Sequence, residues 1–126
     1  MHTDEEMLNQ VTERIIGCAF KVANVLGCGF VEKVYENAMV HELRKSGLSV
    51  QQQKSVTVTY DGIIVGEYLA DLLVEEKVLV ELKSVRALED AHTAQCLNYL
   101  AATGFPICLL INFGKRVEVK RFKGQS

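Results

Sequence analysis

The first third of the chain repeats apolar residues at helical intervals. Thr3 and Glu6 have the spacing of a capping box, which predicts that a helix begins here. Apolar residues then recur every three or four positions as far as Leu26, where a glycine-rich break follows. A second helix is expected over about 31–46, ended by Gly47. The chain therefore begins with two amphipathic helices.

Alternating apolar and polar positions predict strands in the middle of the chain. Segments 55–60 and 63–68 flank Asp61-Gly62, a strong hairpin signal, and a second hairpin is expected over 71–83. The remaining elements are a helix and two strands, at 89–103, 107–111 and 117–122. The predicted order is two helices, four strands, a helix and two strands. This order indicates an α/β fold with a mixed sheet, one face of which is covered by the crossover helix.

The hairpin from Asp71 to Lys83 carries the clearest chemical signal. If the chain turns at its polar run, residues 75–77, Asp71 lies opposite Glu81. A two-residue turn would send Asp71 to the other face, but only the three-residue loop gives one continuous apolar face. Two like charges directly opposite each other destabilise a sheet, so the pair indicates that a cation, a proton or a neighbouring Lys offsets the repulsion. The alternative is an ordinary solvated strand face. The expected apolar face comprises Leu72, Val74, Val78, Val80 and Leu82.

Composition narrows the class of protein. A chain of 126 residues with 48% hydrophobic and 24% charged residues is typical of one soluble globular domain, here 1–126. Its net charge of −2 gives no general attraction to nucleic acid, so such binding needs a local patch or bound cations. The four cysteines include no C-x-x-C pair, which predicts buried free thiols. An acidic N-terminus and the lack of a membrane-length apolar run favour a cytoplasmic protein with no membrane partner.

Three motifs resemble those of the PD-(D/E)xK nuclease superfamily. The trio Asp71, Glu81 and Lys83 matches the superfamily signature in spacing and in the elements it occupies. Residues 29–35 match the G-x-x-E-x-x-Y motif of the GxxExxY protein family, and residues 95–99 resemble the Q-x-x-x-Y motif of nuclease domains in recombination helicase–nuclease complexes. The resemblance implies a restriction-endonuclease-like core, in which a helix precedes an antiparallel meander, a crossover helix and a further strand.

The resemblance covers residues from about 13 to 122 and departs from the superfamily at Ala70, where a proline is usual. It implies a metal-dependent nuclease acting on DNA. Asp71, Glu81 and the backbone carbonyl of Leu82 would bind Mg²⁺ or Mn²⁺, which prefer oxygen ligands. By the same resemblance, Lys83 would orient the attacking water or stabilise the phosphorane, and the alternative is a salt bridge to Glu81 or Asp71.

Two helices supply further candidates. By resemblance, Glu32 is a fourth acidic group that binds the metal or contacts a ligand's water, and the alternative is a solvated glutamate. We expect Glu36 to be solvated and Tyr35 to pack in the core with its hydroxyl hydrogen-bonded. Gln95 and Tyr99 are spaced four residues apart and project from one side of a helix, where they would bind a phosphate or hold Lys83 unless they are merely amphipathic packing. His41 and His92 are expected at the surface.

The last strand is basic. Lys115, Arg116, Lys120 and Arg121 would track a phosphate backbone, or they form a solvated charge run. Because a chain this small has little surface for a duplex, a homodimer or a larger complex is plausible. The rival interpretation is a non-catalytic nucleic-acid-binding or protein-interaction module that retains the nuclease fold. An unrelated small-molecule enzyme finds no support, since the chain has neither a glycine-rich phosphate loop nor a nucleophile–base pair.

Overall fold

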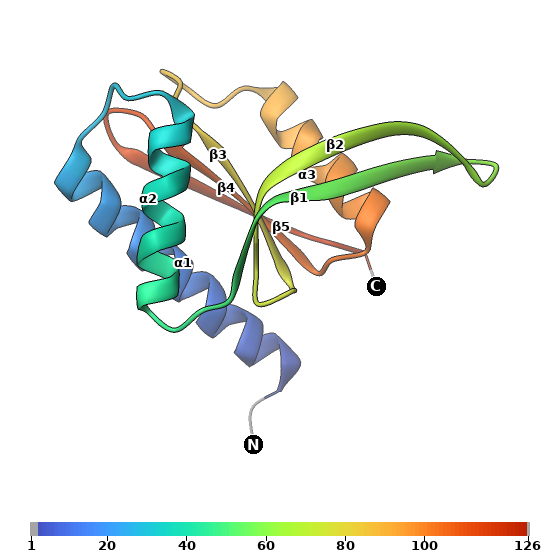
Figure 1. The fold of residues 1–126 in the computed structure, drawn as a ribbon, viewed down its shortest axis with the longest axis horizontal. Helices are drawn as coiled ribbons and strands as arrows, with labels where there is room; N and C mark the ends of the chain where they lie inside the picture. Colours follow the sequence, from blue (N-terminus) through green and yellow to red (C-terminus); the bar gives the residue numbers. More distant parts are fainter. Residues whose placement is uncertain (1–2, 126) are drawn as a thin grey trace.

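In the computed structural model, which describes residues 3–125, a five-stranded mixed sheet is packed between helices on both faces (Figure 1). The helices are α1 (Asp4–Leu26), α2 (Glu32–Lys45) and α3 (Asp90–Thr103). The strands are β1 (Val50–Tyr60), β2 (Ile63–Val74), β3 (Val78–Lys83), β4 (Ile107–Phe113) and β5 (Val117–Lys123). They lie in the order β1-β2-β3-β4-β5, and only β3 and β4 are parallel. The two N-terminal helices, the antiparallel meander and the crossover helix α3 are as predicted.

Strand β2 differs from the sequence prediction. The pattern predicts separate strands over 63–68 and from Asp71, whereas β2 runs unbroken from Ile63 to Val74. Leu69 and Ala70 between them contain no turn residue, and both pair with β1, at Ser55 and Lys54. Three strands therefore precede α3 instead of four, and β2 reaches from the sheet into a projecting hairpin (Figure 1).

The core consists of two apolar layers, one on each face of the sheet. The predicted apolar face of the β2–β3 hairpin packs against α1 and α2. On the other face, Leu73 and Leu79 pack beneath α3 with residues of β4. Every residue of β4 is buried, as expected for a strand in a parallel pair that is covered on both sides. Among the described helices, none combines the length and apolar character needed to cross a membrane.

The turn at residues 75–77 sets the register that the sequence predicts. Leu73 pairs with Leu79 and Val74 pairs with Val78 across β2 and β3. Glu75 has a positive φ of 53°, and its carboxylate accepts hydrogen bonds from the backbone N–H and the hydroxyl of Ser49, at 2.7 and 2.8 Å. These bonds stabilise the three-residue loop and thereby the position of every residue further along the hairpin.

Strand β1 is kinked at Gln53, whose φ is +58°. Regular pairing with β2 is interrupted there, since it passes from Gln52 opposite Leu72 to Lys54 opposite Ala70. Leu72 packs on the α1 and α2 side, whereas Ala70 belongs to the layer under α3, although strand alternation alone would put both on one face. The hairpin therefore turns at this point. Beyond it, residues 55–69, here called the arm, project away from the body of the sheet (Figure 1).

The four cysteines are all free thiols, and three of them, Cys18, Cys96 and Cys108, are buried as predicted. Cys28 is exposed, so the prediction is wrong for this residue. It lies in the connection between α1 and α2, outside the periodic apolar pattern that ends at Leu26.

Candidate active site on the β2–β3 hairpin

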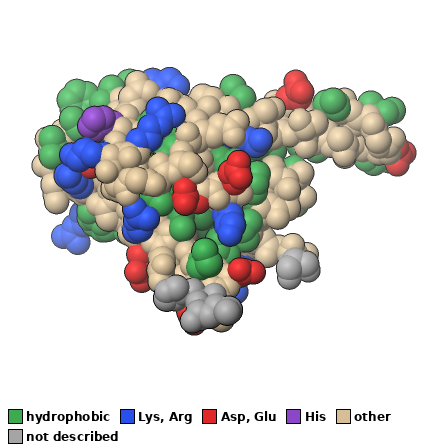
Figure 2. Space-filling model, turned by 60° about the horizontal axis from the view of Figure 1, so that its bottom comes forward, with side chains coloured by type: hydrophobic (Ala, Val, Ile, Leu, Met, Phe, Trp, Pro, Cys, Tyr) green, Lys and Arg blue, Asp and Glu red, His purple; other side chains and the backbone are tan. Residues whose placement is uncertain are grey.

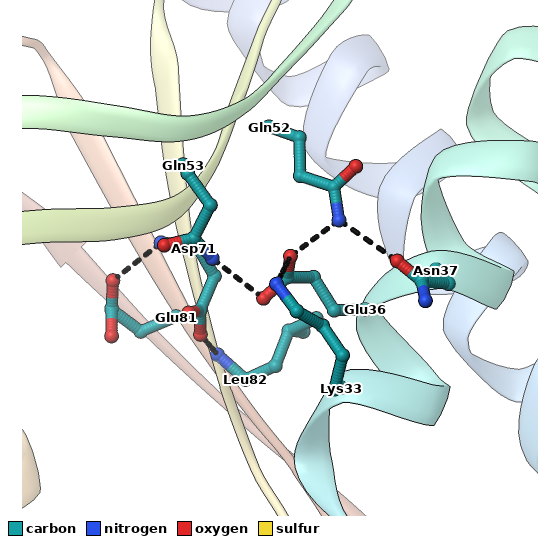
Figure 3. Close-up of polar contacts among 8 residues, drawn as sticks. All are labelled: Lys33, Glu36, Asn37, Gln52, Gln53, Asp71, Glu81 and Leu82. Carbon is teal, nitrogen blue, oxygen red and sulfur yellow. Dashed lines mark hydrogen bonds and ion pairs between the residues drawn. The ribbon is translucent and has the colours of Figure 1, made fainter.

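Asp71 and Glu81 face each other at the open end of the β2–β3 hairpin, where their carboxylates take over the role of backbone acceptors. The backbone N–H of Asp71 donates to Oε1 of Glu81 at 3.0 Å, and the N–H of Leu82 donates to Oδ2 of Asp71 at 2.7 Å (Figure 3). The regular backbone pairing of β2 with β3 begins at Leu72, the residue after Asp71. Each carboxylate is thus tied to the opposite strand, and the two acidic side chains stay adjacent despite their repulsion.

The surroundings of this pair favour its protonated forms. Glu81 is 3% exposed, and burial together with the neighbouring Asp71 carboxylate raises the pKa of Glu81 to about 8. Burial also raises the pKa of Asp71 to about 6, although the hydrogen bond from Leu82 opposes this. The positive charge of Lys83 lowers both pKa values without offsetting the burial. Near neutral pH the free pair therefore retains a proton that a bound cation would displace.

Lys83 lies at the end of β3 beside these carboxylates. Within residues 3–125 its ammonium forms neither an ion pair nor a hydrogen bond, so the salt bridge that the sequence left open is not formed. Asn112, in the neighbouring strand β4, pairs with Lys83 across the sheet. The side chain of Asn112 accepts from the N–H of Val85 and donates to its carbonyl, both at 2.9 Å. The backbone that follows Lys83 is therefore held while its ammonium stays available to a ligand.

Gln95 and Tyr99 lie on α3, the helix that covers one face of the sheet. The Gln95 side-chain amide donates to the Tyr99 hydroxyl at 3.0 Å, and Tyr99 is 5% exposed. Burial and then the negative charge of Glu81 raise the pKa of Tyr99, so its hydroxyl lies within electrostatic reach of the site. His92, one turn earlier, has a different role: its Nδ1 accepts from the N–H of Glu89 at 3.0 Å and so helps to cap the helix.

Helix α2 contributes two glutamates with different environments. Glu32 is exposed, and its charge contributes to the raised pKa values of Asp71 and Glu81. The expectation that Glu36 is solvated is wrong, since only 4% of Glu36 is exposed. The polar run of three glutamines in β1 is the sequence signal that could have revealed this partner, because Gln52 and Gln53 both bind Glu36.

The buried Glu36 carboxylate links α2 to the kink in β1. Its Oε2 accepts from Lys33 at 2.8 Å and from Gln52, and its Oε1 accepts from Gln53 at 2.8 Å (Figure 3). Burial alone would raise the pKa of Glu36, but these hydrogen bonds hold it below its ordinary value. Glu36 is therefore a charged carboxylate whose bonds keep Gln53 in its strained conformation opposite Asp71.

Tyr35 is a core residue with a hydrogen-bonded hydroxyl, as predicted. Its hydroxyl donates to the carbonyl of Gly27 at 2.6 Å and accepts from the N–H of Phe30 at 3.3 Å. Its ring stacks on Phe113 with centroids 4.4 Å apart. The Ser84 hydroxyl donates to the carbonyl of Phe30 at 2.7 Å. The segment 29–35 therefore ties the connection between α1 and α2 to the strand end that follows Lys83.

The basic residues of the C-terminal region do not form one continuous stripe. Arg121 faces α1, where it donates to the side-chain carbonyl of Asn9 at 2.7 Å. Strand alternation directs Lys120 to the opposite face of β5. Lys115 and Arg116 lie in the turn before β5 and line a groove of about 740 Å³ that also includes Arg86. The expected phosphate-tracking surface is therefore divided, because a strand cannot point neighbouring side chains the same way.

The donor set fits a hard divalent cation that binds together with an anionic ligand. Among residues 3–125 no group of three or more His, Cys, Asp and Glu side chains gathers into a metal cage. Asp71 and Glu81 nevertheless each keep one oxygen, Oδ1 and Oε2, that no hydrogen bond within this range occupies. Mg²⁺ is commonly bound by one or two carboxylates, with waters and substrate phosphates completing the coordination.

The chain is similar to a known protein family. The model of the PD-(D/E)XK nuclease superfamily, whose members generally use divalent metals, matches residues 9–122. The crystal structure of SSO0001 superposes with a TM-score of 0.60 at 14% identity, covering 75% of this chain and 51% of that one. The chain thus spans about half the length of SSO0001, and at this identity the likeness shows the fold alone.

A second solved structure, the alkaline exonuclease LHK-Exo from Laribacter hongkongensis, gives a TM-score of 0.49 at 14% identity, covering 99% of this chain and 73% of that one. No curated protein sequence matches the chain. The family match extends over nearly the whole sequence and includes the Asp71 to Lys83 hairpin. The chain therefore belongs to the PD-(D/E)XK nuclease superfamily.

Proposed function

We propose that this protein is a metal-dependent phosphodiesterase that cleaves DNA, and that it is a member of the GxxExxY family. The observation that carries the proposal is the apposition of Asp71 and Glu81, two carboxylates held side by side by backbone hydrogen bonds with one oxygen of each left unused. Such a pair costs folding free energy in the absence of a cation, because burial and mutual repulsion oppose both charges. The chain belongs to a nuclease superfamily, and a carboxylate pair that binds a divalent metal fits the hydrolysis of phosphodiesters.

The residues around the pair would divide the work of hydrolysis. Asp71 and Glu81 would hold Mg²⁺ or Mn²⁺, with the backbone carbonyl of Leu82 and the exposed Glu32 as further oxygen donors. The bound cation would supply an activated water and stabilisation of the phosphoryl charge. Lys83, whose ammonium has no partner within residues 3–125, would orient that water toward the phosphorus.

Two further groups of residues would contact the substrate. Gln95 and Tyr99, joined by a hydrogen bond on α3, would bind a phosphate of the substrate or hold Lys83. Nucleic acid would be drawn to the cations Lys115 and Arg116, which share a groove with Arg86 beside the end of β3, while Lys120 and Arg121 would reach the backbone on either face of β5. We place the protein in the cytoplasm, where its free cysteines would stay reduced, and treat residues 1–126 as one nuclease-like domain.

The test is a cleavage assay with a matched pair of variants. Purified protein is incubated with Mg²⁺ or Mn²⁺ and a panel of single-stranded, duplex and branched DNA and the corresponding RNA. Glu81→Gln removes a charge from the site, whereas Glu67→Gln makes the same change at an exposed position on the arm. We expect metal-dependent cleavage of DNA by the wild type and by Glu67→Gln, and none by Glu81→Gln or in EDTA. Equal cleavage by both variants would contradict the proposal, and binding without turnover by the wild type would favour a non-catalytic module.

A further inference from the structure

The arm is a two-stranded ribbon, and within residues 3–125 neither of its edges pairs with a further strand. Strand β3 pairs with β2 only from Leu72 to Val74, which leaves that side of β2 unpaired along the arm in the described part of the chain. Strand β1 is the edge of the sheet, and no described strand pairs with it on its outer side. Two-stranded ribbons are only marginally stable in water, and open edges offer unpaired N–H and C=O groups to another strand. The arm therefore has the backbone geometry of a strand-pairing surface (Figure 1).

Most of the large apolar side chains of the arm face water, although Val56 at its base is buried. At its tip, Tyr60, Ile63, Ile64 and Val65 are each 60–70% exposed. Ile63 and Ile64 are neighbours in the strand and point to opposite faces, so the tip is apolar on both sides. Figure 2 shows hydrophobic side chains along this projection. Nearer the body, Tyr68 and Leu69 are also more than half exposed. Natural edges are often protected by lysines, prolines or β-bulges; lysine and proline do not occur between residues 55 and 69, and the pairing of β1 with β2 is irregular between Val58 and Thr59.

The charge of the arm points to a protein partner. Between residues 55 and 69 the charged side chains are Asp61 and Glu67, and this segment contains no Lys or Arg. Proteins bind nucleic acid mainly by neutralising phosphates with cations, and an acidic ribbon would be repelled from a phosphate backbone. The surface proposed above for nucleic acid lies elsewhere, at the turn before β5.

The exposed apolar surface of the arm is large enough for an interface with the arm of a second copy of this chain. Six side chains of this size, each more than half exposed, present on the order of 600 Å² of surface, as large as the largest apolar patches of ordinary monomers. A stable interface uses about 800 Å² from each partner, so two arms with their flanking backbone reach that range. A twofold interface needs a self-complementary surface, and a ribbon with open edges provides one.

We propose that the arm is a dimerisation element and that its occupant is the arm of a second copy of this chain, paired edge to edge about a twofold axis. The inference does not depend on the proposed catalytic function. It has a consequence for the site, because the Tyr68 ring on the arm lies 5.8 Å from that of Tyr99, centroid to centroid. Pairing of the arms would fix Tyr68, and the groove of about 720 Å³ between arm and α3 would keep its shape.

The experiment is a measurement of mass in solution for the full chain and two variants. Ile63→Lys with Val65→Lys puts charges on the arm, and Val25→Lys is the matched control, since Val25 is an exposed apolar residue at the end of α1. By sedimentation velocity the wild type and Val25→Lys should have twice the 14.0 kDa mass of the chain. The double variant should be monomeric, with dimerisation weakened by at least about 100-fold. Circular dichroism melts establish that all three proteins are folded.

Hydrogen exchange gives an independent readout that needs no variant. If the arms pair, exchange of the amides in residues 56–68 slows as the protein concentration rises, while exchange in β4 is unchanged. A wild type that remains monomeric at about 100 μM, or arm amides that exchange independently of concentration, would overturn the proposal. Equal dissociation of the Val25→Lys control would also overturn it. So would a monomeric wild type whose arm variant loses affinity for duplex DNA, because the arm would then be a nucleic-acid contact.

Discussion

Strand β2 has an inner and an outer half, and each half places side chains in an unfavourable environment, the inner half a carboxylate inside the protein and the outer half apolar groups in water. The inner half, residues 70–74, brings the carboxylate of Asp71 into the protein beside the buried Glu81. The outer half, residues 63–69, places large apolar side chains in water. One strand thus half-buries a carboxylate at one end and exposes hydrophobic groups at the other. Each arrangement costs free energy in the isolated chain.

The difference between the halves lies in what surrounds them. The inner half has β1 and β3 on its two sides and helices above and below, so its hydrogen bonds can hold two carboxylates together against their repulsion. The outer half pairs within the sheet only with β1, and besides the contact of Tyr68 with Tyr99 it faces solvent, where it can meet another molecule. The rigidly held inner half is thus suited to a catalytic site, and the less supported outer half is suited to pairing with another molecule. The following predictions test this division, starting with the largest expected effect.

Removing the ammonium of Lys83 should abolish most of the proposed cleavage while leaving the metal site intact. Lys83→Ala is expected to lower kcat/KM by at least about 100-fold, because positioning of the nucleophile is lost. Mn²⁺ affinity, measured by calorimetric titration, should stay close to that of the wild type, whereas Glu81→Ala should lose both activity and metal binding. The control is Lys77→Ala, an exposed lysine in the turn of the same hairpin. An equal loss of Mn²⁺ affinity in Lys83→Ala and Glu81→Ala would rule out the water-orienting role.

The buried pair should make the metal-free protein less stable as the pH rises. The pKa of Glu81 is raised from 4.5 to about 8 on folding, so between these pH values the unfolded chain has released a proton that the folded protein still binds. The free energy of unfolding in EDTA should therefore fall from about pH 5 to pH 8, on the order of 2 kcal/mol after allowance for solvent screening, and then level off. Asp71 contributes in the same direction up to its pKa of about 6.

Urea denaturation at several pH values measures this fall, and the comparison of the two halves of the hairpin sharpens it. Glu81→Gln should remove most of the decrease between pH 6 and pH 8, because no proton remains to be released in that window. Glu67→Gln, the same change on the exposed arm, should leave the profile unchanged. A profile that is flat in the wild type, or equally altered by both variants, would show that the pair is not held as the geometry indicates.

Neutralising Asp71 should raise stability slightly and remove the response to metal. Asp71→Asn relieves the repulsion with Glu81 and keeps an oxygen that can accept from the N–H of Leu82, so we expect a gain of roughly 0.5–1 kcal/mol in EDTA. Millimolar Mn²⁺ should raise the melting temperature of the wild type and barely change that of the variant, since only a folded site that binds the ion is stabilised. Equal stabilisation of both proteins by Mn²⁺ would exclude Asp71 as a ligand.

The smallest effects are expected on α3. Gln95→Ala and Tyr99→Phe each break one hydrogen bond of this helix without opening a large cavity. Each should weaken turnover by about tenfold or less while the melting temperature stays within a few degrees of the wild type. Steady-state kinetics and thermal melts distinguish the two contributions. A large fall in melting temperature with unchanged activity per folded molecule would assign these residues to packing.

Local patterns were enough to predict much of this molecule. The capping box at Thr3, the glycine that ends α3 and the turn at residues 75–77 act over a few residues, so the helices and the register of β2 with β3 could be read from the sequence. The register in turn predicts that Asp71 lies opposite Glu81. Hydrogen bonds within a turn and the alternation of side chains along a strand depend only on near neighbours, which explains why these inferences hold.

Only the tertiary structure decided which polar groups are buried and where the strands bend. Glu36 stays charged although it is buried because Lys33 of its own helix and the two glutamines of β1, Gln52 and Gln53, bond to it. Nothing in the helix around Glu36 specifies the two glutamines, which are 16 and 17 residues away. The kink at Gln53 and the projection of the arm likewise depend on how α2 packs against β1. The sequence determined the elements and the paired carboxylates through short-range interactions. Contacts between distant segments determined the shape around them, because burial is a property of the packed whole.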